Sequence, residues 1–196
     1  MPRARIHQTN AARQAAYRKR KKRPVPKIAR VWSMPNRWTF TIPPIARLLK
    51  QECNGTGWVD PFAGMKSPAQ FTNDLNPAAN ATSHMDALLF LKSLPSATYN
   101  GVLFDPPYSI TQARTCYQGR GMNLLNTKPT SMKYWGDCKT EVARILKPQG
   151  KAICFGWTSQ GIGINRGFEM HSILLVPHGG SKNDTIVTVE VKKENP

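Results

Sequence analysis

Apolar residues recur along this chain in short runs whose length indicates buried strands rather than helices. Most of the runs end near glycine, proline, asparagine or aspartate, which commonly terminate strands. The expected strands are residues 56–60, 71–77, 101–105, 151–157, 171–179 and 184–193.

Between these runs, apolar residues follow a helical spacing in three places. Residues 43–52 begin with two prolines, which suit the first turn of a helix, and carry Ile45, Leu48 and Leu49 on one face. Residues 81–94 and 139–150 show a similar spacing. Pro148 and Gly150 are expected to end the helix of residues 139–150. Strands that alternate with helices and then close with a strand pair predict an α/β sheet with an antiparallel end.

Positive charge is concentrated before the first expected strand. The chain has 28 Lys and Arg against 11 Asp and Glu, and residues 1–51 hold 14 of these cations and no acid. Because residues 1–30 have no apolar stripe with which to dock on a core, we expect them to be a disordered basic arm and residues 31–196 to be a single domain. Nucleic acid is the commonest partner of so basic a protein.

The remaining composition favours a reduced, cytoplasmic protein without a metal site. The four cysteines are scattered and form no C-x-x-C motif, and no histidine stands at a ligand spacing from them. No apolar run approaches the roughly 18 residues that a membrane span requires. The N-terminus also lacks the apolar segment of a secretory signal peptide.

Three of the expected strands end on acidic residues, in the stretches WVD-PFAG, TND-LNP and LFD-PPY. In an open α/β sheet, ligands bind at the carboxyl ends of the strands. Three carboxylates at one sheet edge therefore predict a binding site rather than a part of the core.

Residues 38–191 resemble the S-adenosylmethionine-dependent methyltransferases that act on exocyclic amines of nucleic-acid bases. DPFAG at 60–64 is similar to the cofactor loop of that family, Asp74 to the acid that takes the ribose hydroxyls, and Asp86 to the residue that holds the adenine amine. FTIPP at 40–44 resembles the segment at the methionine end of the cofactor, and DPPY at 105–108 the catalytic tetrapeptide. The resemblance implies a Rossmann-like methyltransferase sheet, mostly parallel with an antiparallel C-terminal strand and with helices on both faces.

On this resemblance, site residues can be assigned one by one. Those expected to bind the cofactor, S-adenosyl-L-methionine, are Phe40, Thr41, Asp60, Pro61, Phe62, Ala63, Gly64, Asp74, Leu75, Asn76, Asp86 and Ala87. Those expected to be catalytic are Asp105, Pro106, Pro107 and Tyr108. The chain departs from the family after Gly64, where Lys66 and Pro68 replace the usual second glycine, and we expect the first crossover to be shortened to a loop.

The tetrapeptide suits amine chemistry, because the lone pair of a base amine is delocalised into the ring. The Asp105 carboxylate and the Pro106 carbonyl can accept the two N–H bonds and free that lone pair by electrostatic positioning. Tyr108 is expected to stack on a base that is flipped out or already unpaired.

The expected substrate is DNA, with adenine N6 as the target, and RNA remains open. Recognition is assigned to Arg114 and Arg120 in the loop after Tyr108 and to the arm residues Arg18, Lys19, Arg20, Lys21, Lys22 and Arg23. Two alternatives remain. One is methylation of a guanine N2 amine in ribosomal RNA, and the other is non-catalytic nucleic-acid binding on a decayed methyltransferase fold.

Overall fold

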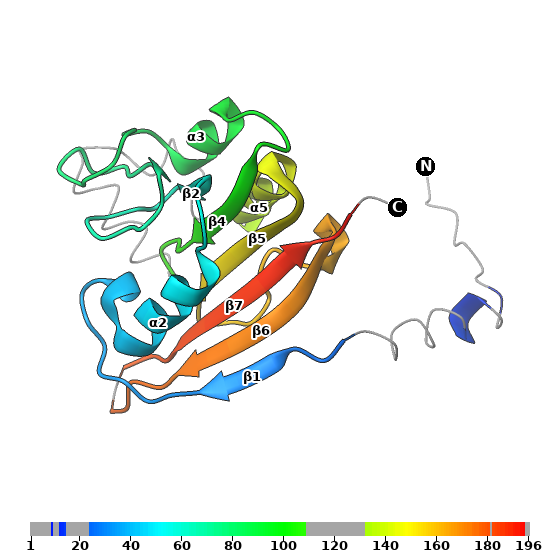
Figure 1. Ribbon diagram of the computed structural model, residues 1–196, viewed down its shortest axis with the longest axis horizontal. Helices are drawn as coiled ribbons and strands as arrows, with labels where there is room; N and C mark the ends of the chain where they lie inside the picture. Colours follow the sequence, from blue (N-terminus) through cyan, green and yellow to red (C-terminus); the bar gives the residue numbers. More distant parts are fainter. Residues whose placement is uncertain (1–8, 10–11, 15–23, 109–131, 181, 195–196) are drawn as a thin grey trace.

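A computed structural model describes residues 9, 12–14, 24–108, 132–180 and 182–194 of the chain. In this described part, seven strands form one sheet in the order β1-β6-β7-β5-β4-β2-β3 (Figure 1). The strands are β1 (Lys27–Arg30), β2 (Trp58–Asp60), β3 (Phe71–Thr72), β4 (Tyr99–Phe104), β5 (Leu146–Gly156), β6 (Phe168–Val176) and β7 (Thr185–Lys192). The helices are α2 (Pro43–Glu52), α3 (Ala87–Ser93) and α5 (Met132–Ile145), with short 3-10 turns η1 (Thr39–Thr41) and η2 (Ile164–Arg166).

Strand direction confirms the expected mixed sheet. β7 is antiparallel to both of its neighbours, β5 and β6, whereas the pairs β1–β6, β2–β3, β2–β4 and β4–β5 are parallel. All strands other than β7 therefore run in one direction, and their carboxyl ends lie at the same edge of the sheet.

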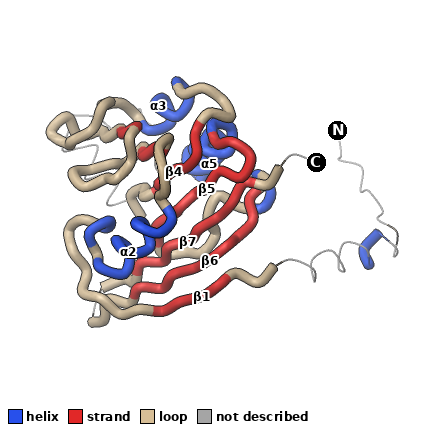
Figure 2. Tube along the Cα trace, viewed as in Figure 1, coloured by secondary structure: helices blue, strands red, loops and turns tan. Residues whose placement is uncertain are grey.

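Helices cover both faces of the sheet, as expected (Figure 2). Side chains alternate along a strand, so Val102 and Phe104 of β4 pack with α3 and α5, while Leu103 packs on the opposite face with α2. Pro44, Ile45 and Leu49 are the buried residues of α2, and the prolines occupy its first turn, where a missing N–H costs nothing.

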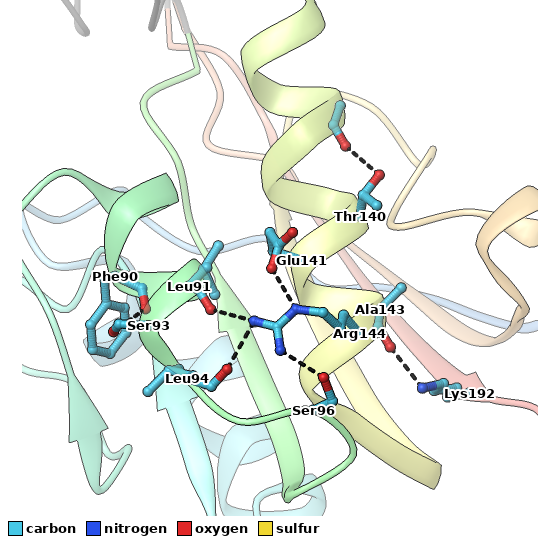
Figure 3. Close-up of polar contacts among 11 residues, drawn as sticks. Phe90, Leu91, Ser93, Leu94, Ser96, Thr140, Glu141, Ala143, Arg144 and Lys192 are labelled. Atoms are coloured by element: carbon cyan, nitrogen blue, oxygen red, sulfur yellow. Dashed lines mark hydrogen bonds and ion pairs between the residues drawn. The ribbon is translucent and has the colours of Figure 1, made fainter.

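Arg144 of α5 joins this helix to the end of α3 (Figure 3). Its Nη2 donates to the carbonyl oxygens of Leu91 and Leu94, both at 2.9 Å, and its Nη1 donates to Ser96 Oγ at 2.8 Å. Glu141, one turn earlier on α5, accepts from Nε at 2.6 Å and orients the guanidinium. The Leu91 carbonyl also accepts from Leu94 N at 3.3 Å, and Arg144 adds a side-chain donor to it and to the carbonyl of the C-cap residue Leu94.

The domain begins earlier than we expected. Residues 27–30, which the sequence assigned to the disordered arm, form β1 and pair in parallel with β6 from Lys27↔Ser172 to Arg30↔Leu175. Val31 and Ser33 continue this contact through hydrogen bonds to the Leu175 and Pro177 carbonyls. The boundary at residue 30 is therefore wrong, because a four-residue edge strand needs little apolar content of its own.

Two other elements differ in length from the expectation. α5 ends at Ile145 and the chain enters β5 at Leu146, so residues 147–150 lie within the strand span as a bulge between the pairs Tyr99↔Leu146 and Gly101↔Lys151. The second expected strand shortens to the two residues of β3, and residues 61–70 contain no helix, which confirms the shortened first crossover.

Within the residues that the structure describes, no helix combines the length and the apolar character needed to cross a membrane.

Candidate active site

Acidic and amide side chains gather at the carboxyl edge where β2, β3 and β4 end. Asp60 is the last residue of β2, Asn73 and Asp74 follow β3, and Asp105 follows β4. β2 lies between β3 and β4 and is parallel to both, which brings the three strand ends together as the sequence predicted.

A first pocket of about 330 Å³ opens at this edge. Nine residues that the sequence assigned to the site line it: Pro61, Phe62, Asp74, Leu75, Ala87, Asp105, Pro106, Pro107 and Tyr108. Four further lining residues were not predicted, namely Thr39, Asn73, Met85 and Trp135. Asn73 could have been found from the sequence, because it is a polar residue directly after a strand and beside Asp74.

Asn73 is fully buried and braces one wall of the first pocket. Its Nδ2 donates to the carbonyls of Pro61 at 3.2 Å and Met85 at 3.0 Å, and its Oδ1 accepts from Met85 N at 3.0 Å. The loop after β2 is thereby fixed to the segment that precedes α3.

Asp60 lies beneath the first pocket rather than on its surface. Its carboxylate is completely buried and accepts from Phe62 N at 2.9 Å and from Ser67 Oγ at 2.6 Å. Burial raises the pKa of Asp60 to about 7, although the hydrogen bonds from Ser67 and Phe62 act in the opposite direction. Its contacts shape the loop after β2, and through Phe62 N they position a residue of the pocket lining.

Asp74 lines the first pocket and also organises the loop before it. Its Oδ2 accepts from Gly64 N at 2.8 Å and its Oδ1 from Asn76 N at 2.7 Å. Each carboxylate oxygen has a second lone pair, so both can still accept a ligand hydroxyl. Gly64 has a φ of 55°, a left-handed conformation that favours glycine.

Asp86 does not line the first pocket, in contrast to its expected role beside the cofactor adenine. It is the N-cap of α3, where its Oδ1 accepts from Leu88 N at 2.9 Å and Leu89 N at 3.2 Å. Its Oδ2 accepts from the Tyr134 hydroxyl of α5 at 2.9 Å. The position explains the carboxylate as a cap, and Ala87 and Met85 on either side form the pocket wall instead.

Five other expected cofactor residues also lie off the first pocket, and one of them is Gly64, whose N–H donates to Asp74. Phe40 packs on Phe155 with ring centroids 5.1 Å apart, and Thr41 donates its hydroxyl to the Trp38 carbonyl. Ala63 is buried, and Asn76 accepts from Ala78 N in a turn. The segment before α2 does reach the pocket, but through Thr39.

The tetrapeptide 105–108 is built around the Asp105 carboxylate. Desolvation raises the pKa of Asp105 to about 6, and hydrogen bonds from the Tyr108 and Thr39 side chains act against that rise. The Tyr108 hydroxyl donates to Asp105 Oδ1, and burial beside this carboxylate raises the pKa of the phenol well above its usual value. Tyr108 also packs edge-on against Trp157, with ring centroids 5.8 Å apart.

A second pocket of about 420 Å³ lies on the other side of the tetrapeptide. It shares Pro106, Pro107, Tyr108 and Trp135 with the first pocket, so the tetrapeptide forms part of the partition between them. Its other lining residues come from the end of β4, from α5, from the end of β5 and from the crossover after it: Phe104, Gly136, Lys139, Cys154, Phe155, Gly156, Trp157, Thr158, Gln160, Gly161 and Arg166. The sequence predicted no functional role for these residues.

The expected nucleic-acid contacts fall outside the described residues. This applies to residues 18–23 of the basic arm and to Arg114 and Arg120 in the loop after Tyr108.

Comparisons with known proteins identify the fold. No family model matches the chain, and no curated protein matches its sequence. Among solved structures, the chain is similar to the 1,6-didemethyltoxoflavin-N1-methyltransferase of Burkholderia thailandensis, whose structure contains 1,6-didemethyltoxoflavin and S-adenosylhomocysteine, with 12% identity, a TM-score of 0.52 and 77% of each chain covered. It is also similar to TrmN of Thermus thermophilus, with 16% identity and a TM-score of 0.50, over 77% of this chain and 49% of TrmN. The chain thus spans about half the length of TrmN, and both similarities show a methyltransferase fold.

Proposed function

We propose that the protein transfers a methyl group from S-adenosylmethionine to an exocyclic amine of a nucleic-acid base, and that this amine is adenine N6 in DNA. The observation that carries the proposal is the DPPY turn, which stands after β4 as part of the partition between two pockets. A methyl transfer needs two ligands that meet at one point. The turn offers a carboxylate and a carbonyl at that point.

The first pocket suits the cofactor. Asp74 has free lone pairs for a ribose diol, Phe62, Leu75 and Met85 offer apolar surface for an adenine ring, and Thr39 offers a hydroxyl near Asp105. When bound, S-adenosylmethionine supplies an electrophilic methyl group on a sulfonium. The residues of the chain orient it and exclude water from the reacting atoms.

Asp105 and Pro106 suit the amine that accepts the methyl group. With a pKa of about 6, the Asp105 carboxylate is largely ionised at neutral pH and can accept an N–H bond, while the Pro106 carbonyl can accept the other. The Tyr108 hydroxyl donates a hydrogen bond to Asp105 Oδ1 and so fixes the orientation of the carboxylate. We had expected Tyr108 to act only as a stacking ring, and this hydrogen bond adds a positioning role.

Charge favours nucleic acid as the substrate. The net charge is +17, and half of the cations lie in residues 1–51 without a single acid. A small-molecule methyltransferase has no need of such a segment, whereas every phosphate contact strengthens the binding of a nucleic acid.

Expression in a methylation-deficient bacterium, followed by mass spectrometry of nucleosides from its DNA and RNA, tests the proposal. N6-methyladenine in the DNA is expected, and its loss with Asp105→Asn shows that it comes from this site. N2-methylguanine in ribosomal RNA would overturn the DNA assignment. The absence of any new modified base, together with no calorimetric binding of S-adenosylmethionine by folded protein, would overturn methyl transfer and favour non-catalytic binding.

A further inference from the structure

The crossover from β5 to β6, residues 157–167, links the two edges of the sheet. It leaves Gly156 at the carboxyl edge, beside the candidate active site, and reaches Phe168 at the opposite edge, because β5 and β6 run in the same direction. Pro24 and Pro26, which precede β1, lie at this opposite edge as well, since β1 is parallel to β6. A surface along the crossover thus joins the active site to the point where the basic N-terminal segment enters the fold.

Two hollows follow one another along this crossover. The second pocket lies at its beginning, and a groove of about 280 Å³ lies at its end, lined by Pro24, Pro26, Gln160, Gly163, Ile164, Phe168, Glu169, Met170, Glu190 and Lys193. Gln160 lines both hollows and is exposed, so the two adjoin at this residue. We call the surface formed by the two hollows and Gln160 the crossover track.

The second half of the crossover is held by hydrogen bonds to its neighbours. The buried Glu190 of β7 accepts from Ile162 N at 2.5 Å and Gly163 N at 3.1 Å, and a Cβ at Gly161 would overlap its carboxylate. Arg166 donates to the carbonyls of Ile162 at 3.2 Å and Gly136 at 3.1 Å and so ties the crossover to α5. A surface fixed in this way needs little reorganisation when a ligand binds.

Charge along the crossover track suits a polyanion. Lys139 lines the second pocket, and its positive charge acts on the buried Glu190 and Cys154, whose pKa values burial raises and this charge lowers. The acids of the track are neutralised or buried: Glu169 pairs with Lys193 at 3.1 Å, and Glu190 is only 2% exposed. The basic stretch 18–23 directly precedes the groove in sequence.

Apolar side chains on the track suit bases that are not paired. Trp157 is 41% exposed at the second pocket and Ile164 is 44% exposed at the groove. The second pocket thus combines an aromatic ring, Trp157, with a cation, Lys139. Single strands bind on this combination, because bases stack on the ring while the cation contacts the phosphate. A rigid duplex offers its bases only at the groove floors and does not match these hollows.

We propose that the crossover track binds an unpaired nucleic-acid strand, which runs from the second pocket over Gln160 to the groove at Pro24 and Pro26, with Lys139 as a phosphate contact. This inference rests on the proposed function for the identity of the ligand. The inference adds the path of the nucleic-acid strand over the protein, from the carboxyl edge of the sheet to the opposite edge.

The test is equilibrium binding of fluorescently labelled single-stranded DNA and RNA dodecamers to the full chain over a range of salt, without cofactor. Lys139→Gln should reduce the slope of log affinity against log salt by about 0.7, the value for one phosphate contact on a single strand. Ile164→Asp places a negative charge on the track and should weaken binding at least ~5-fold through repulsion of the phosphates. Matched controls on other surfaces are Lys50→Gln on α2 and Leu89→Asp on α3, and both should bind like the unchanged protein.

Thermal unfolding confirms that each variant is folded, and Lys139→Arg should restore the slope because it restores the charge. The proposal is overturned if Lys139→Gln and Ile164→Asp behave like their controls, or if a fully paired duplex shows the same sensitivity to both variants as the single strands. The assay involves no methyl transfer, so its outcome is separate from that of the proposed function. If Lys139→Gln and Ile164→Asp change single-strand binding as expected but the protein methylates no nucleic acid, only the methyltransferase activity is overturned. If the protein methylates nucleic acid but both variants bind like their controls, only the crossover track is overturned.

Discussion

Asp105 is subject to two opposing influences on its pKa. Removal from water favours the neutral acid, while hydrogen bonds from Tyr108 and Thr39 favour the carboxylate, and the balance leaves the pKa at about 6. This value keeps the group ionised at neutral pH yet close enough to titration for a modest change in its surroundings to matter. The two donors therefore tune the group that we propose to hold the acceptor amine.

We predict that the methylation rate falls as the pH drops below about 6, because protonation of Asp105 removes the acceptor for the amine N–H. Thr39→Val removes one of the hydrogen bonds that stabilise the carboxylate and should move this inflection to higher pH. At pH 8, where Asp105 is ionised, Asp105→Asn should lower the rate at least ~100-fold and leave cofactor binding nearly unchanged, and this difference should narrow toward pH 5. Single-turnover methylation rates of the wild type, Thr39→Val and Asp105→Asn between pH 5 and pH 8 test these three expectations. A flat profile, or a rate near wild type in the Asn variant, would show that the tetrapeptide is structural.

Asp60 predicts an effect on stability rather than on chemistry. Burial raises its pKa in the folded protein from 3.8 to about 7, so between these values the folded state holds a proton that the unfolded state has released. The contribution of Asp60 to stability therefore falls as the pH rises from about 4 to 7, by up to ~4 kcal/mol. Asp60→Asn, which cannot titrate, should gain stability relative to wild type over the same interval. Urea unfolding of both proteins at pH 4.5 and 8 measures this, and an equal difference at the two pH values would contradict it.

At the scale of elements, the sequence was informative where apolar spacing was strong and misleading where it was weak. α2 begins at the expected proline and β2, β4, β6 and β7 lie within a few residues of their expected ranges, because each must bury a continuous apolar face. β1 was missed because an exposed edge strand needs no such face. The sequence did not reveal that Asp86 caps α3, because a helix cap and a ligand-binding carboxylate look alike in a sequence, and its expected contact with the cofactor stays a prediction.

The contact between α3 and α5 depends on Arg144, which no sequence pattern revealed. Arg144→Ala removes the guanidinium donor from the Leu91 and Leu94 carbonyls, of which Leu91 keeps only the Leu94 N–H, and should lower the free energy of unfolding by about 2–4 kcal/mol. Arg144→Lys should recover only part of this, because a single ammonium cannot reproduce the guanidinium fork. Lys133→Ala, which breaks an exposed ion pair with Asp137 on the same helix, serves as the control and should leave stability nearly unchanged. Equal denaturation midpoints for Arg144→Ala and Lys133→Ala would contradict this account of the helix contact.

At the scale of the whole molecule, the position of β1 changes how the basic arm relates to the site. β1 runs parallel to β6, so the chain enters the fold at the sheet edge opposite the carboxyl ends that carry Asp74 and Asp105. The arm is therefore not attached beside the reacting atoms. A long nucleic acid could reach both the arm and the candidate active site, which divides the work between binding at one edge and chemistry at the other.

This division gives the last prediction. Deletion of residues 1–23 removes the six consecutive cations at 18–23 but keeps Pro24 and the whole of β1. If four to six arm charges contact phosphates, the slope of log affinity against log salt on duplex DNA should fall by about 3.5–5.5, at roughly 0.9 per contact. Replacing residues 18–23 with glutamine should give most of the same loss without shortening the chain, while glutamine at Arg47 and Lys50 of α2 should change the slope little.

Phosphate contacts carry little sequence information, so the methylated base and its sequence context should stay the same. An unchanged slope would show that the arm does not contact DNA, and an altered sequence context would show that it reads bases as well as phosphates.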